Sequence, residues 1–302
     1  MTLFSLLKWG EKILSQTAIE NPLLESEILL RAAFNLSKSQ LLSRLQDLVQ
    51  EDSSLFKTYV KSRREGIPLA YITQTTEFGS RTYTVLPGVL IPRPETEWLV
   101  QEAISHIEAS SHQEWQIIEC GFGTGIISIE LSKQFPDTPI LAWDINPKAY
   151  ENAIMNAKKH LVPTTIFRQG DFFQQKKTLQ SCLSNGKQTV LVCNPPYISD
   201  SDYANLESQI LDHEPITALK AGPKGIEFYD KLLSFLKPFC LTLICEIGIH
   251  QRPPLENMFK TYQNEPARFV KDFHGIYRVF ILNKTSDILD NTKSLNATFG
   301  DS

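Results

Sequence analysis

The chain has 302 residues, a formal net charge of −4, and 42% hydrophobic and 21% charged residues. This is the composition of an ordinary globular protein, and the length suits a small domain followed by one of standard size. No apolar run approaches the roughly 18 residues of a membrane span, so no membrane partner is expected. The slightly acidic balance argues against an extended nucleic-acid surface.

The cysteines and histidines give no sign of a metal site. Five cysteines, at positions 120, 182, 193, 240 and 245, form no CxxC pair, and four of them lie in apolar, strand-like runs. We expect them to be reduced core residues, which favours a cytoplasmic location. The six histidines show no metal-binding spacing, so no metal is predicted.

The first 65 residues carry a helical pattern of apolar positions. Met1 to Leu14 is typical of an amphipathic helix, and Asn21-Pro22 and Asp52-Ser53 are expected helix starts. We expect residues 1–72 to form a helical, substrate-docking domain. The part up to Ser80 is neutral, with nine basic and nine acidic residues. Its basic cluster Lys61, Arg63 and Arg64 indicates a solvated helix face, with an RNA contact as the alternative.

Residues 73–92 are predicted to be a β-hairpin linker. Alternating residues run from Glu77 to Val89 and are punctuated by Gly79 and Pro87-Gly88. The stretch LIPRPETE at 90–97 follows. Its two prolines beside Arg93 predict an extended loop, and Thr96 between two glutamates suits a helix N-terminus.

From Trp115 onward, strands and helices alternate. Apolar runs predict strands at 117–120, 140–143, 165–167, 190–193 and 241–245, with helical stretches between them. This alternation implies right-handed βαβ units and a parallel sheet. The runs 268–270 and 277–282 are too close for a crossover, so they should form an antiparallel hairpin. We expect the polar residues 286–302 to be a disordered tail.

A polar motif, Asn194-Pro195-Pro196-Tyr197, follows the apolar run 189–193. Ligands of open α/β sheets collect beyond the carboxyl ends of the strands, so the motif stands where chemistry is expected. The Asn194 oxygen and a proline carbonyl can accept the two N–H groups of a planar amide, and Tyr197 offers an aromatic face. Two prolines remove competing donors. Taken alone, the motif also fits an ordinary turn.

A glycine-rich turn, Glu119-Cys-Gly-Phe-Gly-Thr-Gly125, follows the first strand of the sheet. Glycines at 121, 123 and 125 let the backbone approach a ligand closely. The dinucleotide fingerprint needs a further glycine where Ile126 stands. The motif therefore favours a ligand without a pyrophosphate, such as S-adenosylmethionine. Asp144, at the end of the next strand, is expected to receive both ribose hydroxyls.

Three more residues complete the predicted cofactor site. Glu119 can accept a hydrogen bond from the ammonium group of S-adenosylmethionine, directly or through water. Asp171 can accept one from the adenine amino group, and Phe172 can cover the adenine ring. The predicted cofactor-binding residues are Glu119, Gly121, Phe122, Gly123, Thr124, Gly125, Asp144, Asp171, Phe172 and Asn194.

Several motifs together resemble one family. They are GxPxxYI at 66–72, LIPRPETE at 90–97, GxGxG at 121–125, NPPYI at 194–198, Glu214-Pro215 with Ala218-Leu219, and Glu246-Ile-Gly248 with Gln251. The combination is similar to the peptide chain release factor N(5)-glutamine methyltransferases (the PrmC/HemK family) over about residues 1–283. Glu119 departs from the family's usual Asp, and residues 237–240 lack its Gly-Gly turn.

The resemblance implies fold, reaction and partners. The fold would be α/β, with residues 93–285 forming a seven-stranded class I S-adenosylmethionine-dependent methyltransferase domain, Rossmann-like in architecture. The reaction would be methylation of the glutamine side-chain amide in the GGQ motif of release factors. Asn194, Pro195, Pro196 and Tyr197 are then the predicted catalytic residues, with supporting roles for Arg93 and Glu246. A monomer that binds the GGQ-containing domain, and no nucleic acid stably, is expected.

Three alternatives remain. A sister glutamine methyltransferase acts on a ribosomal protein, and the PETE sequence favours the release factor enzyme. Adenine amino-methyltransferases of DNA share NPPY, but they must extract a base and usually need a basic recognition region. A non-catalytic adaptor on the same scaffold is disfavoured, because GxGxG, Asp144 and NPPY are all intact.

Overall fold

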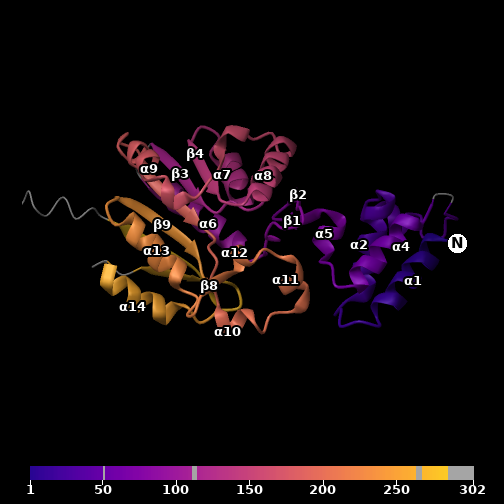
Figure 1. The fold of residues 1–302 in the computed structure, drawn as a ribbon. Coiled ribbons are helices and arrows are strands. Elements are labelled where there is room, and N and C mark those ends of the chain that lie inside the picture. Colours follow the sequence, from indigo (N-terminus) through magenta and orange to yellow (C-terminus); the bar gives the residue numbers. More distant parts are fainter. Residues whose placement is uncertain (50–51, 111–113, 263–266, 285–302) are drawn as a thin grey trace, which may run out of the picture.

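The computed structural model describes residues 1–49, 52–110, 114–262 and 267–284. A helical domain, a β-hairpin and an α/β domain follow one another along the chain (Figure 1). The tail predicted for residues 286–302 lies outside the described residues. In the part that the structure describes, no helix is long and apolar enough to cross a membrane.

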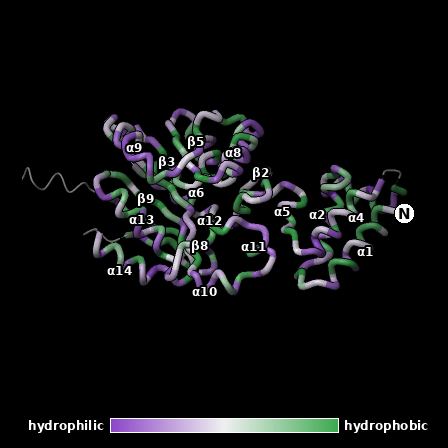
Figure 2. Tube along the Cα trace, viewed as in Figure 1, coloured by the Kyte–Doolittle hydropathy of each residue, from purple (hydrophilic) through white to green (hydrophobic). Residues whose placement is uncertain are grey.

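The helical domain is built around its first two long helices and α4. The Asn21 side chain accepts a hydrogen bond from the Leu24 N–H, and Pro22 occupies the first turn, which confirms this predicted helix start. Hydrophobic and hydrophilic residues alternate along the helices, and the hydrophobic ones form a separate core (Figure 2). The helices are α1 Leu3–Leu14, α2 Pro22–Phe34, α3 Lys38–Ser43, α4 Ser54–Arg64 and α5 Leu69–Thr73.

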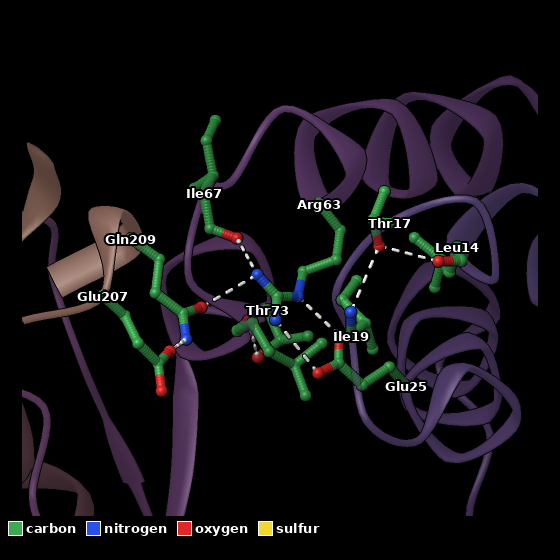
Figure 3. A network of polar contacts seen from close by, with 10 residues as sticks. Leu14, Thr17, Ile19, Glu25, Arg63, Ile67, Thr73, Glu207 and Gln209 are labelled. Atoms are coloured by element: carbon green, nitrogen blue, oxygen red, sulfur yellow. Dashed lines mark hydrogen bonds and ion pairs between the residues drawn. The ribbon is translucent and has the colours of Figure 1, made fainter.

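Arg63 is buried, with 7% of its surface exposed, so the predicted solvated basic cluster is wrong for this residue. Its guanidinium pairs with both carboxylate oxygens of Glu25 in α2. It also donates to the Ile67 carbonyl at 3.3 Å and to Gln209 Oε1 at 3.0 Å (Figure 3). Gln209 belongs to α11 (Ser208–His213) of the α/β domain, so Arg63 joins the two domains.

The predicted hairpin is confirmed, with β1 (Thr75–Phe78) antiparallel to β2 (Arg81–Thr84). Two buried asparagines of α8 (Pro147–Lys159) bind the end of this hairpin. Asn156 Oδ1 accepts from Thr84 N at 2.7 Å, and Asn152 Oδ1 accepts from Leu86 N at 2.8 Å. Both asparagines also donate to the Thr84 carbonyl. The hairpin is therefore fixed to the α/β domain at the end of its second strand.

The α/β domain contains a seven-stranded sheet of order β10-β11-β9-β6-β3-β4-β5. The five neighbouring strands β9, β6, β3, β4 and β5 pair in parallel. Strands β10 and β11 form the predicted antiparallel hairpin, and β11 is antiparallel to β9. The third predicted strand begins two residues later than expected, because residues 164–166 form a 3-10 turn after Pro163. The strands are β3 Trp115–Cys120, β4 Ile140–Asp144, β5 Phe167–Gln169, β6 Gln188–Cys193, β9 Leu241–Glu246, β10 Arg268–Lys271 and β11 Tyr277–Lys284.

Helices cover both faces of this sheet. Successive strand residues point to opposite faces of the sheet and pack into two separate cores. Ile117 and Val190 belong to one core, and Ile118 and Leu191 belong to the other. One face packs against α6 Thr96–Glu108, α7 Ile126–Gln134 and α8 Pro147–Lys159. The other packs against α9 Lys176–Leu183, α13 Glu227–Leu236 and α14 Arg252–Tyr262. The predicted α/β fold with a seven-stranded sheet is confirmed.

An irregular segment separates β6 from α13. Two very short strands in it, β7 and β8, pair in parallel and were not predicted. Figure 1 shows α11 on the side of the α/β domain that faces the helical domain. The elements are β7 Ile198–Ser199, α10 Asp200–Tyr203, α11 Ser208–His213, α12 Ile216–Leu219 and β8 Lys220–Gly222.

Candidate functional site

A cavity of about 310 Å³ lies beyond the carboxyl ends of β3, β4 and β6, where α/β sheets bind ligands. The structure brings most of the predicted site together here. The predicted residues that line it are Gly121, Gly123, Asp144, Asp171, Phe172, Asn194, Pro195 and Pro196.

The glycine turn opens its backbone to this cavity. Gly121 and Gly123 have φ of +78° and +52°, and a Cβ added to either would have no atom within 4 Å. Gly125 is different, since a Cβ there would lie 2.9 Å from Phe167 and 3.0 Å from Ala153. The first two glycines thus keep space for a ligand, and the third permits close packing of the turn against β5 and α8.

Asp144 ends β4 and holds the glycine turn. Its Oδ2 accepts from Gly123 N and its Oδ1 from Asn146 N, both at 2.8 Å. Burial raises the pKa of Asp144, whereas these two backbone hydrogen bonds lower it. Each carboxylate oxygen keeps a further lone pair, so vicinal hydroxyls can still donate to it.

Aromatic side chains line one end of the cavity. Asp171 accepts from Phe173 N at 2.9 Å, which sets the turn that carries Phe172. The Phe172 ring packs edge-on against Trp143 at 6.0 Å between centroids. Phe173 and Lys231 also line the cavity and were not predicted. The Lys231 ammonium lies 3.8 Å from the centroid of the Phe173 ring. This end suits a flat, apolar ring system with a polar edge.

Phe122, Thr124 and Gly125 do not line the cavity, although they were predicted to bind the cofactor. The Phe122 ring is buried against Phe167, with centroids 4.9 Å apart. The Thr124 carbonyl accepts from Asn156 at 2.9 Å. These residues shape the glycine turn from beneath.

Glu119 is fully buried and is also absent from the cavity lining. Its Oε2 accepts from the Ser128 amide at 3.2 Å and from the Ser128 hydroxyl, which fixes the first turn of α7. Among the described residues, its Oε1 has no hydrogen-bond partner. Burial raises the pKa of Glu119 to about 8. Its contact with an ammonium group stays a prediction.

The backbone of the NPPY motif is held by one later side chain, that of Gln251. Gln251 Nε2 donates to the Tyr197 carbonyl at 2.7 Å and to the Gly225 carbonyl at 2.8 Å. Gln251 Oε1 accepts from Gly248 N at 2.9 Å. All three polar groups of the Gln251 amide are thereby used to fix the backbone after Pro196, which explains a glutamine at this position.

A second, smaller cavity of about 200 Å³ adjoins the motif. It shares three lining residues, Leu90, Asn194 and Ala218, with the first cavity. Tyr197 and Arg93 line only this one. Its remaining lining residues are Ile198, Leu206, Ile210 and Leu219. Asn194 therefore stands on the wall between two spaces, and most of the smaller space is apolar.

Arg93 and Glu246 each meet a buried partner near this second cavity. Glu214, 6% exposed, accepts from Arg93 at 2.6 Å and from Ile91 N at 3.1 Å. Glu246 accepts from the Thr96 hydroxyl at 2.7 Å and from the Tyr197 hydroxyl at 3.3 Å. Burial raises the pKa of Glu246 to about 7.

Thr96, Glu214 and Gln251 were not singled out as site residues from the sequence. The sequence places Thr96 in a helix start, and it does begin α6, but its hydroxyl bonds to Glu246 and Asn194. The only signal for all three was their presence in the motifs that carry the family resemblance. In the described part of the chain, no cluster of His, Cys, Asp and Glu has the arrangement of a metal site.

Two family models match the chain. Residues 5–73 match the PrmC N-terminal domain, and residues 100–222 match the methyltransferase small domain. The first match covers most of the helical domain, and the second runs from α6 to β8, including the glycine turn and NPPY.

Curated relatives match along nearly the whole length. The release factor glutamine methyltransferase of Nitratidesulfovibrio vulgaris is 32% identical over 285 residues, which cover 92% of this chain and 93% of that protein. The protein of the same name from Bacillus subtilis is 31% identical over 283 residues, covering 91% and 95%. That from Moorella thermoacetica is 33% identical over 290 residues, covering 93% and 98%. The chain belongs to the family of release factor glutamine methyltransferases.

Proposed function

We propose that the protein transfers a methyl group from S-adenosylmethionine to the side-chain amide nitrogen of the glutamine in the GGQ motif of peptide chain release factors. One observation carries the proposal: Asn194 lines both the larger cavity and the smaller one. A side chain in this position can meet a methyl donor on one side and a substrate amide on the other.

The larger cavity fits S-adenosylmethionine. Gly121 and Gly123 leave open space beside the backbone, where any side chain would intrude. Asp144 retains lone pairs for two ribose hydroxyls, and Asp171 with Phe172 suits the adenine amino group and ring. When bound, S-adenosylmethionine supplies a methyl group activated by a positively charged sulfur. No metal is needed for this chemistry.

The NPPY motif orients the nucleophile. An amide nitrogen is a poor nucleophile, because its lone pair is delocalised into the carbonyl. Asn194 Oδ1 and a proline carbonyl of the motif each accept one N–H of the substrate amide, which aims its nitrogen at the larger cavity. Tyr197 lines the smaller cavity. In the proposed complex, its ring packs against the amide plane. Orientation of this kind supplies roughly 7–11 kcal/mol in favourable systems.

The helical domain docks the release factor. Several of its leucines are partly exposed, at 40% for Leu23, 44% for Leu24 and 56% for Leu42. The neutral charge of the domain suits a protein partner better than a phosphate backbone. We infer a cytoplasmic monomer that acts on release factors and binds no nucleic acid stably.

A methyl-transfer assay tests this function. The full chain is incubated with labelled S-adenosylmethionine and one of three acceptors: a release factor, a ribosomal protein known to accept methyl on glutamine, or duplex DNA. The expected result is label on the release factor, at the GGQ glutamine by peptide mass spectrometry. Label on the ribosomal protein or on DNA instead would favour the corresponding alternative, and label on none of them would overturn the proposal.

A further inference from the structure

A buried polar chain links three elements that are far apart in the sequence. Asn194 Nδ2, after β6, donates to Thr96 Oγ1 in the first turn of α6 at 3.2 Å. Thr96 Oγ1 in turn donates to Glu246 Oε2 at the end of β9, at 2.7 Å. Thr96 is 4% exposed and Glu246 2%, so solvent does not compete for these bonds.

The donors in this chain determine which way the Asn194 amide faces. A hydroxyl has one proton, and an ionised carboxylate can only accept. The Thr96 proton is therefore committed to Glu246, and Thr96 offers Asn194 only a lone pair. Asn194 must therefore donate from its NH₂ group to Thr96 Oγ1, and its Oδ1 is turned away from Thr96. Among the described residues, no protein group donates to Asn194 Oδ1.

We propose that Thr96 is a positioning residue, which together with Glu246 holds the Asn194 amide with its oxygen toward the substrate amide. The proposal rests on the proposed function and deepens it. With the opposite orientation, Asn194 would present an NH₂ group to the NH₂ group of the substrate glutamine. Two donors cannot satisfy one another, so the substrate amide would lose its alignment.

The surroundings of Glu246 set the pH at which it changes from acceptor to donor. Burial raises the pKa of Glu246, and Glu95, which precedes α6, raises it further. The hydrogen bonds from the Thr96 hydroxyl and from the Tyr197 hydroxyl, the latter at 3.3 Å, lower this pKa, and so does the charge of Arg278 in β11. The resulting pKa is about 7. When Glu246 takes up a proton, it becomes a donor to Thr96 Oγ1. The Thr96 proton is then released to Asn194, and the preference for the productive orientation is lost.

Three variants of the full chain test this relay, with a release factor as acceptor. Thr96→Val keeps the shape and removes the hydroxyl, Thr96→Ser keeps the hydroxyl, and Glu246→Gln removes the titration. We expect Thr96→Val to lower kcat about tenfold or more. The affinity for S-adenosylmethionine, measured by calorimetry, should stay within about threefold of wild type. Thr96→Ser should retain most of the wild-type kcat.

The pH profile provides a readout that a purely structural role would not move. Wild-type kcat should rise with pH through about 7, as Glu246 ionises. Glu246→Gln should lose this rise and have a lower kcat at pH 8, because a glutamine can present either its oxygen or its nitrogen to Thr96. If Thr96→Val does not fold, the pH profiles of kcat for Glu246→Gln and Thr96→Ser still test the relay.

Three results would overturn the relay: Thr96→Val with a kcat within about twofold of wild type, Thr96→Ser as slow as Thr96→Val, or an unchanged acid limb in Glu246→Gln. Each of them presupposes an active wild-type enzyme. Absence of methyl transfer by the wild type would instead remove the proposed function itself, so the two failures are distinguishable.

Discussion

The Glu214 carboxylate lies 2.6 Å from the Arg93 guanidinium, across 121 residues of sequence. Its other oxygen accepts from Ile91 N, so Glu214 ties the segment after NPPY to the loop before α6. Both segments line the smaller cavity, through Arg93 on one side and Ala218 on the other. The shape of that cavity therefore depends on Glu214.

Replacing Glu214 should affect the acceptor more than the methyl donor. Glu214→Ala leaves the partly buried Ile91 N–H unpaired and Arg93 without its partner, at a cost of roughly 1–3 kcal/mol in the free energy of unfolding. Glu214→Gln keeps an acceptor and should cost less. We expect a raised KM for the release factor in both variants, measured by methyl transfer, with little change in S-adenosylmethionine affinity. A selective loss of S-adenosylmethionine affinity would contradict this expectation.

Asn194→Ala should slow methyl transfer strongly and leave the methyl donor bound. The substrate amide loses an acceptor in a dry site, at roughly 1–3 kcal/mol in binding alone. Lost alignment adds to this in the transition state, so kcat should fall further than affinity. Asn194→Asp should also slow transfer, because a negative charge stabilises the positively charged ground state more than the transition state, where the charge disperses.

Both Asn194 variants should bind S-adenosylmethionine within about tenfold of wild type, because the glycine turn and Asp144 remain. Calorimetry and single-turnover rates measure the two effects separately. Near-wild-type transfer by Asn194→Ala would show that NPPY is only a turn.

Asp144→Ala should weaken S-adenosylmethionine binding. Hydrogen bonds to a charged acceptor contribute roughly 1.5–3 kcal/mol each, so a loss of at least tenfold in affinity is expected. The variant also leaves the Gly123 and Asn146 amides without their present acceptor, so its melting temperature must be measured alongside. Unchanged affinity in a folded variant would remove Asp144 from the predicted site.

Glu119 should make the stability of the ligand-free protein depend on pH. Its pKa is raised from an ordinary value of 4.5 to about 8, so the folded state binds this proton more tightly than the unfolded state does. The resulting stability is fully present below about pH 4.5 and is lost as pH rises through 8, at roughly 1.4 kcal/mol per pKa unit.

Glu119→Gln removes this dependence. Melting temperatures of the variant and of wild type, recorded from pH 5 to 9, should therefore move apart in favour of the variant as pH rises. Parallel curves would show that Glu119 does not carry the effect. The same variant tests the predicted ammonium contact, which requires a loss of S-adenosylmethionine affinity in calorimetry.

Gln209→Ala removes the hydrogen bond that Arg63 makes to the α/β domain, without changing a residue of either core. Arg63 keeps its Glu25 partner in this variant, so stability should fall by only about 0.5–1.5 kcal/mol. If the helical domain docks the release factor, methylation of the intact factor should drop more than methylation of a short GGQ peptide. Arg63→Met is the contrasting variant, since it strands the Glu25 carboxylate and should destabilise the protein more. Equal losses on both substrates for Gln209→Ala would argue against docking.

Most of the fold was predictable because its elements have local signals. Strands β3, β4, β6 and β9 are mostly apolar, and the helix start at Asn21-Pro22 is a capping sequence. Strand β5 was misplaced because the apolar run at 165–167 begins within a 3-10 turn. Strands β7 and β8 have two and three residues, too few for any periodic pattern.

The polar interior was less predictable, because its partners are distant in sequence. Asn152 and Asn156 have the polar side chains of a solvated helix face, yet both are 0% exposed. The sequence around Thr96 predicts a helix start. Only the fold shows that its hydroxyl bonds to Asn194, 98 positions later, and to Glu246, 150 positions later. The cavity-lining glycines and Asp144 were predicted, since a turn motif at the end of a strand is local.

The contacts that Asn152 and Asn156 make with the hairpin bear on how the protein selects its substrate by distance. An isolated two-stranded hairpin is marginally stable in water, but here α8 side chains occupy the backbone groups of Thr84 and Leu86. The hairpin is thereby joined to the α/β domain rather than left as a free linker. If the helical domain docks the release factor, as proposed above, the distance along that partner between its docked surface and its glutamine becomes part of what the enzyme selects.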